Sequence, residues 1–364
     1  MPNSSPTVRK KVLHIISGDL WAGAEAQAYT LLKHLKTLCD VSAVLMNDGE
    51  LATRLRACDI PVKIFDETNL STWQIFGLLR AHIRHLKPNI VHTHRQKENI
   101  LGALANATTV RARCVRTAHG AAEFSGNWKT DLKKNTERWV TRIFHDVIIS
   151  VSNELKEKLA VDYPTTMIKV VHNGVDVTEL KAKADITDFK RQQPDKKHIG
   201  IVGRLVPVKR VDIFLETAAI INRERNSCYH FHVIGDGPLR MDLENMAIQF
   251  DLSDIVTFHG HCSETPSYIN SLDAVMMCSD HEGLPMVALE TIALGKALIS
   301  HVSGAVEQLL TEHKLKGVTQ QDARNYSEHI KAGFEKPLPL KSIYLANINA
   351  ENTSLIYKNH WDQQ

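Results

Sequence analysis

Two glutamates, Glu282 and Glu290, stand eight residues apart in the stretch His281–Glu290. The apolar run Met286–Leu294 predicts a helix, with Pro285 at its start, where the missing N–H costs nothing. Glu282 then lies in the loop before this helix, as an exposed carboxylate, and Glu290 lies within the helix. Helix N-termini attract anions and polar ligands, and ionised carboxylates accept hydrogen bonds from hydroxyls. We therefore expect this loop and helix to hold a sugar ring and a ribose together.

The structural alternative for this pair is that Glu282 caps the helix and Glu290 lies on a solvated helix face. The flanking sequence favours a binding site. The segment Ile269–Cys278 ends in an apolar run that predicts a buried strand, and Gly295–Ser300 predicts a helix stop and a further strand. This order places the Glu-Gly-Leu-Pro loop at the carboxyl end of a parallel strand, where open α/β sheets bind ligands.

Strands and helices alternate along the chain in two series. In the first series, apolar patterns predict strands at Lys11–Ser17, Val41–Met46, Pro61–Phe65, Ile90–His94, Ala112–Ala118, Val147–Val151 and Ile168–His172, with the clearest helices at Ala24–Leu38, Thr72–Leu86 and Thr130–Phe144. A polar stretch, Lys181–Lys197, follows, and the alternation restarts at His198. Such alternation gives parallel sheets with right-handed crossovers. The fold class is therefore α/β, with two Rossmann-like doubly wound domains and a hinge near residue 180.

The motifs in this order resemble one known family. Ser279–Pro285, the helix that carries Glu290, and Gly295–Ala297 resemble the donor-site signature of the retaining, nucleotide-sugar-dependent glycosyltransferases of family 4, also called glycosyl transferases group 1. Four segments upstream resemble further motifs of the family in the family's order: Trp21–Glu25, Val171–Asp176, Ile199–Arg210 and Phe231–Pro238. Each motif is weak by itself, and the ordered set, which spans residues 11 to about 310, is specific.

This resemblance implies the two-domain GT-B arrangement, with the active site in the cleft between the domains. The expected domains are residues 1–180 on the acceptor side, residues 181–340 for the donor, and a last helix in residues 341–364 that crosses back to the first domain. The implied catalytic residues are His119, Arg204, Lys209 and Glu282. The implied donor-binding residues are Gly18, Gly23, Gly203, Arg204, Lys209, Gly283, Leu284, Pro285 and Glu290.

The chain departs from the family pattern in two regions. The motif that usually reads Gly-Gly-x-x-Glu is Ser303–Glu307 here, and a later Asp-Gly-x-x-Gly motif is not recognisable in Thr311–Thr319. In the first loop, Ala22 and Ala24 surround Gly23, where two adjacent glycines are common. These changes concern how the phosphates and the sugar approach the chain, and they leave the class of protein unchanged.

Two cations are suited to the chemistry of a departing nucleoside diphosphate. Arg204 and Lys209 follow a predicted strand, which places them on a loop and a first helical turn. Arginine grips phosphate with two hydrogen bonds and lysine supplies a compact charge, so the pair would stabilise the leaving group without a metal ion. The sequence contains no Asp-x-Asp motif. We expect no metal and no cofactor beyond the nucleotide-sugar substrate, with UDP favoured as the nucleotide.

Histidines stand at the ends of two strands in the first half of the chain. His119, followed by Gly120, ends one strand, and family members carry a histidine there that contacts the donor sugar near its reacting carbon. The alternative is a loop histidine with a purely structural role. His92 and His94 project to the same face of another strand, so they are either metal ligands or, as we prefer, structural or cleft-lining residues.

Composition describes a globular protein of two domains: 364 residues, 43% hydrophobic and 23% charged. The six cysteines are scattered, which argues against zinc ribbons and disulfide frameworks and indicates a reducing cytosol. The N-terminal residues lack the apolar core of a signal peptide, and no apolar run is long enough to cross a bilayer. We expect a cytoplasmic protein.

Charge is distributed unevenly along the chain, and the basic part indicates which kind of acceptor the protein could use. Residues 80–142 hold 13 Lys or Arg against 4 Asp or Glu. Within them, Trp128–Phe144 interleaves aromatic and cationic residues, as interfacial helices do. The preferred interpretation is that Trp139, Ile143 and Phe144 pack into the core. The alternative is peripheral contact with an anionic membrane and a glycan or lipid-linked acceptor. No nucleic-acid fold signature accompanies these charges, so we expect no nucleic-acid partner.

Three other classes of protein compete with a glycosyltransferase. A nucleotide-sugar epimerase shares the architecture, but it is not expected to carry both the Gly-Arg-Leu-x-x-x-Lys motif and the paired glutamates. A dinucleotide-dependent oxidoreductase needs Gly-x-Gly-x-x-Gly after its first strand, and Ser17–Gly23 does not supply it. A catalytically inactive, sugar-nucleotide-binding regulator stays open. The particular sugar, base and acceptor are not readable from the sequence.

Overall fold

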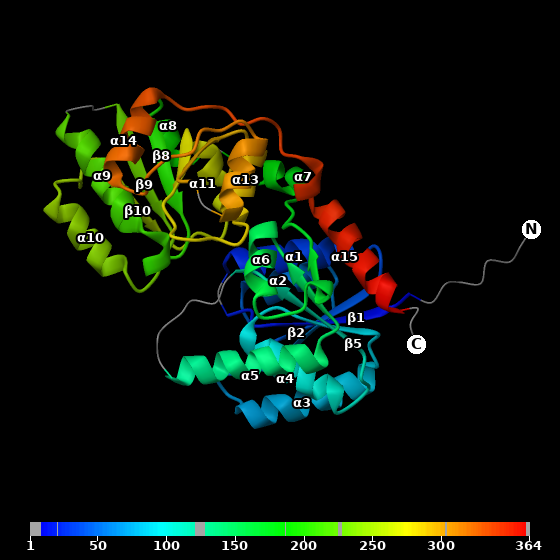
Figure 1. The fold of residues 1–364 in the computed structure, drawn as a ribbon. Helices are drawn as coiled ribbons and strands as arrows, with labels where there is room; N and C mark the ends of the chain where they lie inside the picture. Colours follow the sequence, from blue (N-terminus) through cyan, green and yellow to red (C-terminus); the bar gives the residue numbers. More distant parts are fainter. Residues whose placement is uncertain are drawn as a thin grey trace, which may run out of the picture. The chain divides into compact units, whose positions relative to one another are not determined.

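The computed structural model describes residues 9–19, 21–120, 128–185, 187–224, 228–302 and 304–361. The chain forms two compact units, each built on its own sheet (Figure 1). The first unit consists of Met1–Gly174 with Ala346–Gln364, and the second unit is Val175–Leu345. Among the described residues, no helix combines the length and the apolar character needed to span a membrane.

The first unit is organised around a seven-stranded parallel sheet with the order β3-β2-β1-β4-β5-β6-β7. Its strands are β1 (Lys11–Ile16), β2 (Asp40–Leu45), β3 (Val62–Ile64), β4 (Ile90–Thr93), β5 (Arg113–Ala118), β6 (Val147–Ser150) and β7 (Ile168–Val170). The strand order reverses between β1 and β4. The loops that leave these two strands diverge there, which is the position where doubly wound sheets bind ligands.

Helices cover both faces of this sheet, because alternate residues of each buried strand point to opposite sides. The helices are α1 (Gly23–Leu35), α2 (Glu50–Ala57), α3 (Thr72–Leu86), α4 (Gln96–Ala107), α5 (Trp128–Phe144), α6 (Asn153–Ala160) and α15 (Ala346–Trp361), with a 3₁₀ turn, η1 (Thr165–Met167). Val12 and Ile16 of β1 share a core with α1, α2 and α15. Leu13 and Ile15 share the opposite core with α3 and α4, and α5 packs beside α4.

The second unit has a five-stranded parallel sheet with the order β10-β9-β8-β11-β12. Its strands are β8 (Lys197–Val202), β9 (Tyr229–Ile234), β10 (Val256–Gly260), β11 (Ala274–Met277) and β12 (Ala297–Ser300). Its helices are α7 (Val177–Ala182), α8 (Asp188–Gln192), α9 (Val211–Arg223), α10 (Arg240–Gln249), α11 (Thr265–Ser271), α12 (Met286–Ala293), α13 (Gly304–Glu312) and α14 (Ala323–Ala332), with 3₁₀ turns η2 (Pro207–Lys209) and η3 (Ser342–Tyr344). The strand order reverses between β8 and β11.

The chain passes from the first unit to the second after Gly174 and returns after Leu345. The backbone N–H of Val175 donates to the carbonyl of Tyr344 at 2.9 Å, and α7 packs against α12, so residues 175–180 lie in the second unit. On its return, the chain forms α15, which packs against α1. The side-chain amide of Asn349, on α15, donates to the carbonyl of His172 in the first unit.

The two doubly wound parallel sheets confirm the predicted fold class. The helix predicted from Met286 begins at that residue, as α12, with Pro285 as its N-cap. One local prediction was wrong. Lys209 lies in the 3₁₀ turn η2 and not in the first turn of α9, which begins at Val211.

Candidate functional site

The reversal point of the second sheet lies between two neighbouring parallel strands, β8 and β11. The loop that leaves β8 carries Arg204 and Lys209, and the loop that leaves β11 carries Glu282 and leads into α12. Residues from two distant stretches of sequence therefore meet at one sheet edge. This edge is the position at which open α/β sheets bind their ligands.

Glycines allow the loop after β8 to pack directly on the loop after β9. Gly203 and Gly235 both have positive φ, at 151° and 141°. A Cβ on Gly235 would lie 1.9 Å from the carbonyl oxygen of Gly203, closer than any side chain tolerates. The backbone N–H of Leu205 donates to the carbonyl of Asp236 at 2.9 Å. The backbone that presents Arg204 is thus held by the neighbouring loop.

Lys209 and Glu282 form an ion pair across the reversal point. The Lys209 Nζ lies 2.5 Å from Glu282 Oε1, and the two side chains are 26% and 16% exposed. The expectation of an exposed Glu282 carboxylate was wrong, because the ammonium group covers it. A partly buried pair persists only when its geometry compensates the lost hydration. A ligand that offers anionic oxygens to Lys209 and hydroxyls to Glu282 can replace both partners.

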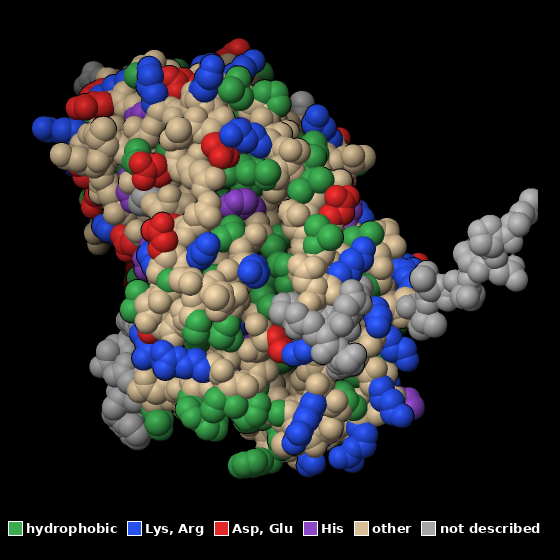
Figure 2. All heavy atoms as spheres, turned by 45° about the vertical axis from the view of Figure 1, so that its right-hand side comes forward, with side chains coloured by type: hydrophobic (Ala, Val, Ile, Leu, Met, Phe, Trp, Pro, Cys, Tyr) green, Lys and Arg blue, Asp and Glu red, His purple; other side chains and the backbone are tan. Residues whose placement is uncertain are grey.

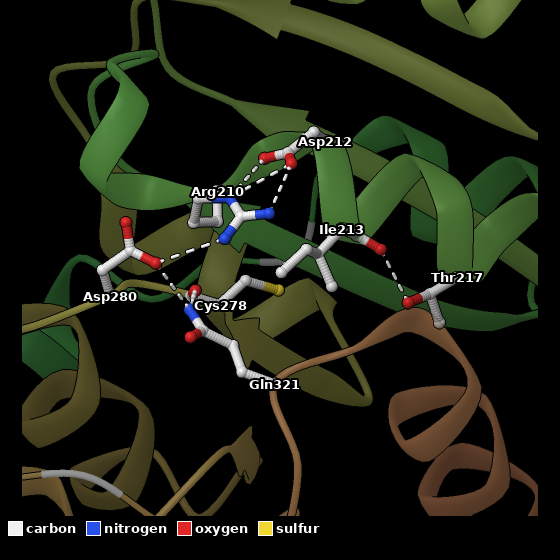
Figure 3. Close-up of polar contacts among 7 residues, drawn as sticks. All are labelled: Arg210, Asp212, Ile213, Thr217, Cys278, Asp280 and Gln321. Atoms are coloured by element: carbon white, nitrogen blue, oxygen red, sulfur yellow. Dashed lines mark hydrogen bonds and ion pairs between the residues drawn. The ribbon is translucent and has the colours of Figure 1, made fainter.

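A second polar network fastens the same two loops (Figure 3). Arg210, which has φ at 48°, donates through Nε and Nη2 to the Asp212 carboxylate and through Nη1 to Asp280 at 3.3 Å. The side-chain amide of Gln321 donates to Asp280 at 3.0 Å and to the carbonyl of Cys278 at 2.6 Å. These contacts bind the turn before α9 and the segment before α14 to the loop that carries Glu282.

The sequence marks only part of this network. Arg210 and Asp280 lie next to the motif residues Lys209 and Glu282, so their proximity to the site could be predicted. Gln321 lies in the segment where the family pattern fades, and no local signal marks it. Ser303, in the first of the atypical motifs, lies outside the described residues.

Arg204 is exposed, and its side chain makes no hydrogen bond or ion pair with any residue that the structure describes. The residues that follow Glu282 differ in burial: Gly283 is half-buried, and Leu284 and Pro285 are buried. An exposed guanidinium without a partner suits an anionic ligand, since arginine binds phosphate through two hydrogen bonds.

Glu290 lies on α12 and is half-buried, which excludes the interpretation as a solvated face residue. Desolvation raises the pKa of its carboxyl from the ordinary 4.5 to about 7. No hydrogen bond or ion pair to this carboxylate occurs within the described part of the chain. A desolvated carboxylate without partners is costly, and such groups concentrate at functional sites. Two neighbouring hydroxyls on a ligand would supply the missing donors.

The reversal point of the first sheet carries Gly18, with φ at 70°, after β1, and Gly23 as the first residue of α1. Arg95, which follows β4, lies 3.1 Å from Asp19 and 2.5 Å from Glu25. Burial raises the pKa of Glu25 to about 7, against the opposing effect of Arg95. The ion pair of Arg95 and Glu25 joins the end of β4 to the first turn of α1. Sequence reasoning named neither residue as part of a site.

His119 follows β5 and is half-buried. Its Nε2 lies 3.2 Å from the Nδ1 of His94. Burial lowers the pKa of His119 to about 3, with further lowering from Arg95 and Arg116. His119 is therefore a neutral imidazole at physiological pH.

His14, His92 and His94 are buried and form a group whose ligand atoms lie within 4.8 Å of one another, close enough to hold a metal ion. His92 already uses both ring nitrogens, with Tyr357 Oη at 2.6 Å and Thr117 Oγ1 at 2.8 Å. Hydrogen bonds within the protein thus satisfy this ring without an ion. These contacts favour a structural role for His92 over metal ligation.

Comparison with known proteins identifies the family of this chain. The model of "Glycosyltransferase Family 4" matches residues 21–179, and the model of "Glycosyl transferases group 1" matches residues 183–344. Together they take in every strand of the two sheets except β1, which precedes residue 21. The chain belongs to this family of glycosyltransferases.

Among curated relatives, the chain is 27% identical over 316 residues to "UDP-Gal:alpha-D-GlcNAc-diphosphoundecaprenol alpha-1,3-galactosyltransferase" of Escherichia coli, which covers 81% of this chain and 80% of that protein. Among solved structures, Anabaena HepE in complex with UDP-glucose has a TM-score of 0.78 at 18% identity, covering 96% and 95% of the two chains. A putative UDP-N-acetylglucosamine 2-epimerase of Listeria monocytogenes has a TM-score of 0.66 at 14% identity, covering 98% of each chain. These structures share the two-sheet fold.

Because the pKa of Glu290 is raised, replacing its carboxyl group by a neutral amide should increase the free energy of unfolding at a pH where the carboxyl is ionised. Because the folded state holds this proton more tightly than the unfolded state does, the stability that protonation contributes is complete below pH 4.5 and is lost as the pH rises through 7. Glu290→Gln should therefore raise Tm at pH 8, by about 2–4 °C for each 1 kcal/mol in a domain of this size, and by less at pH 5. Scanning calorimetry at both values measures this. Glu244→Gln, at a residue whose side chain is 39% exposed and paired with Arg240, is the control. An equal or lower Tm for Glu290→Gln at pH 8 would show that the carboxylate is satisfied.

Proposed function

We propose that this protein transfers a sugar from a nucleotide diphosphate sugar, preferably a UDP-sugar, to a glycan or lipid-linked acceptor with retention of anomeric configuration. The observation that carries the proposal is the Lys209–Glu282 pair at the reversal point of the second sheet. A UDP-sugar and a diphosphoundecaprenol acceptor stand in the name of the Escherichia coli relative, and HepE was solved with UDP-glucose. Both support the proposed substrates.

Donor binding would exchange the partners of the pair. Lys209 would leave Glu282 for a diphosphate oxygen, and Arg204 would donate two hydrogen bonds to the diphosphate. Glu282 would then accept hydrogen bonds from hydroxyls of the transferred sugar, and Glu290 from those of the ribose. Both cations would oppose the charge that develops on the leaving phosphate, and fixed charges of this kind commonly supply the greatest part of an enzyme's rate enhancement.

Retention follows most simply from attack on the face from which the nucleotide leaves. The bond between the anomeric carbon and the diphosphate oxygen breaks, the acceptor oxygen bonds to that carbon, and the acceptor proton passes to the departing phosphate. Glu282 binds hydroxyls in this route. A carboxylate nucleophile, as retaining glycosidases use, would have to be free of the ammonium group that covers Glu282.

A transfer assay tests the proposed reaction. With UDP-, GDP- and ADP-sugars as donors and a diphosphate-linked glycan lipid as acceptor, we expect turnover with one donor class and an unchanged anomeric configuration by NMR. We also expect activity to survive EDTA, because fixed cations replace a metal ion. Inversion, or a loss in EDTA that Mg²⁺ restores, would contradict the mechanism. Interconversion of free nucleotide sugars would indicate an epimerase, and binding without turnover would indicate an inactive regulator.

Calorimetric titration with UDP distinguishes the roles of three of the four charged residues of the site. Lys209→Ala should weaken UDP binding and lower kcat/KM by at least about 10²-fold. Glu290→Ala should weaken UDP binding and raise the donor KM, because the ribose does not react. Glu282→Ala should lower kcat but keep or strengthen UDP binding, because it releases Lys209. Glu244→Ala, which breaks a surface pair of α10, is the control. Loss of UDP binding in Glu282→Ala with normal binding in Glu290→Ala would reverse the assignment.

The acceptor side of the proposal includes peripheral contact with an anionic membrane at its cytoplasmic face. Trp139 and Ile143 are 58% and 53% exposed, so the prediction that they pack into the core was wrong. With Leu132, which is 60% exposed, they fall at i, i+7 and i+11 and form one stripe on α5. Phe144 is partly buried against the small core beside α4. The side chain of Trp128 lies outside the described residues.

Cations and a further helix extend this stripe. Arg142 on α5 and Arg84 on α3 are exposed, and Trp73 at the start of α3 is 82% exposed. Helices α3 and α5 flank α4 on the same face of the first sheet. Figure 2 shows hydrophobic and basic side chains along the lower margin, where these helices lie. Exposed aromatic and aliphatic groups beside cations are typical of a surface that binds anionic lipid headgroups.

Vesicle sedimentation tests this surface. The protein should sediment with vesicles that contain anionic phospholipid, and the bound fraction should fall at high salt. It should not sediment with neutral vesicles. The double variant Trp139→Ala/Ile143→Ser should reduce binding by at least about 10-fold, since each buried side chain contributes on the order of 1.5–3 kcal/mol. Ile248→Ser, on the exposed side of α10, is the matched control. Equal binding by the double variant and the wild type would exclude α5 as the contact.

A further inference from the structure

Three histidines lie buried below His119 in the first unit. His14 belongs to β1 and His92 to β4, with His94 directly after β4, and each is at most 3% exposed. His14 lies on the face of the sheet that α1 and α15 cover, because it alternates with Leu13 and Ile15. With His119, four imidazoles thus lie close together, and His119 is the one that follows β5 at the carboxyl edge of the sheet.

Hydrogen bonds link three of these histidines, His14, His94 and His119, and leave His92 outside the series. The Nδ1 of His14 lies 3.0 Å from the Nε2 of His94, and the Nδ1 of His94 lies 3.2 Å from the Nε2 of His119. His92 stacks on His94 with ring centroids 4.6 Å apart, but its nitrogens bond to a tyrosine and a threonine. A chain of three imidazoles therefore leads from the interior to His119.

The rings of this chain are neutral. Burial lowers the pKa of His14 and of His94 well below the ordinary value, and neighbouring imidazoles add to the effect. A neutral imidazole carries one N–H and one acceptor nitrogen, so the chain permits only two arrangements. Either every ring is protonated at Nδ1 and donates toward His119, or every ring is protonated at Nε2 and donates toward His14.

The surroundings of His14, the innermost of the three hydrogen-bonded imidazoles, favour one of these two arrangements. The Nε2 of His14 is buried and has no hydrogen-bond partner among the described residues. With protonation at Nδ1 throughout, this atom is a bare acceptor. With protonation at Nε2 throughout, it is an N–H donor without an acceptor. Orphaned buried N–H groups are rarer in proteins than under-satisfied acceptors, so the chain favours protonation at Nδ1.

We propose that His14 and His94 are positioning residues that hold His119 as the neutral Nδ1–H tautomer, so that it presents one hydrogen-bond donor to an oxygen of the bound substrate. The Nδ1 of His119 makes no hydrogen bond with the residues that the structure describes and is not a buried orphan. A neutral donor stabilises an oxygen without adding a positive charge to a reaction centre that itself becomes cationic. The role in transfer rests on the proposed function, whereas the tautomer does not.

Nitrogen NMR of the full chain with ¹⁵N-labelled histidine tests the tautomer directly. Ring ¹⁵N shifts and two-bond couplings to carbon-bound protons distinguish Nδ1–H, Nε2–H and imidazolium forms, and the His119 signals are those lost in His119→Gln. We expect the Nδ1–H form at pH 7, although Nε2–H is the form that free histidine favours in water. An Nε2–H or imidazolium signal for His119 in the wild-type protein would overturn the proposal.

Variants test whether the chain is the cause. His94→Leu should return His119 to the Nε2–H form and lower kcat/KM by about 10-fold, the cost of one hydrogen bond. His94→Asn, whose amide can donate to the Nε2 of His119, should restore both. In a His119→Leu background, His94→Leu should have no further effect.

His92→Gln is the matched control, since this ring is equally buried and stacks on His94. It should leave the His119 tautomer unchanged. Two results would show that the buried histidines act only through packing. One is an Nε2–H signal for His119 in His92→Gln, and the other is the same activity loss for His94→Leu with and without His119. An Nδ1–H signal in a protein without transferase activity would uphold the chain and reject the proposed function.

Discussion

The ion pair between Lys209 and Glu282 is the interaction on which the arrangement of the site depends. These side chains stand 73 residues apart in the sequence and meet because β8 and β11 are neighbours at the point where the strand order reverses. The glycines after β8 and β9 set the backbone that presents Lys209, and Arg210, Asp280 and Gln321 fasten the opposing loop. The pair keeps a cation and an anion in place without burying either one alone.

Each unit contains groups that the fold leaves without a partner among the described residues. In the second unit Glu290 is desolvated without a hydrogen bond and Arg204 has no counter-ion, and in the first unit the Nε2 of His14 is buried without a hydrogen-bond partner. The two desolvated groups, on Glu290 and His14, reduce stability. Two large cores, one on each sheet, offset the cost. Such local exceptions concentrate where a protein binds its ligands, because selection for function tolerates a lower stability there.

Much of this arrangement could be predicted from sequence, and the limits have a physical origin. Strand and helix periodicity, together with the motif residues Lys209 and Glu282, located the carboxyl edge of the second sheet. The direct contact between these two residues could not be predicted, because it depends on which strands are neighbours. The chain from His14 to His119 has the same origin, since 80 residues separate His14 from His94. For α5, the pattern suited either a buried or an interfacial helix, and only the packing against α4 showed that Trp139 faces solvent.

A crystal structure of the full chain with UDP would show directly whether Lys209 exchanges its partner. We expect the Lys209 Nζ to leave Glu282 and to lie within hydrogen-bond distance of a diphosphate oxygen, with the Glu290 carboxylate accepting from the ribose hydroxyls. A complex in which UDP binds elsewhere, or in which the Lys209–Glu282 pair stays intact beside the bound diphosphate, would contradict this expectation.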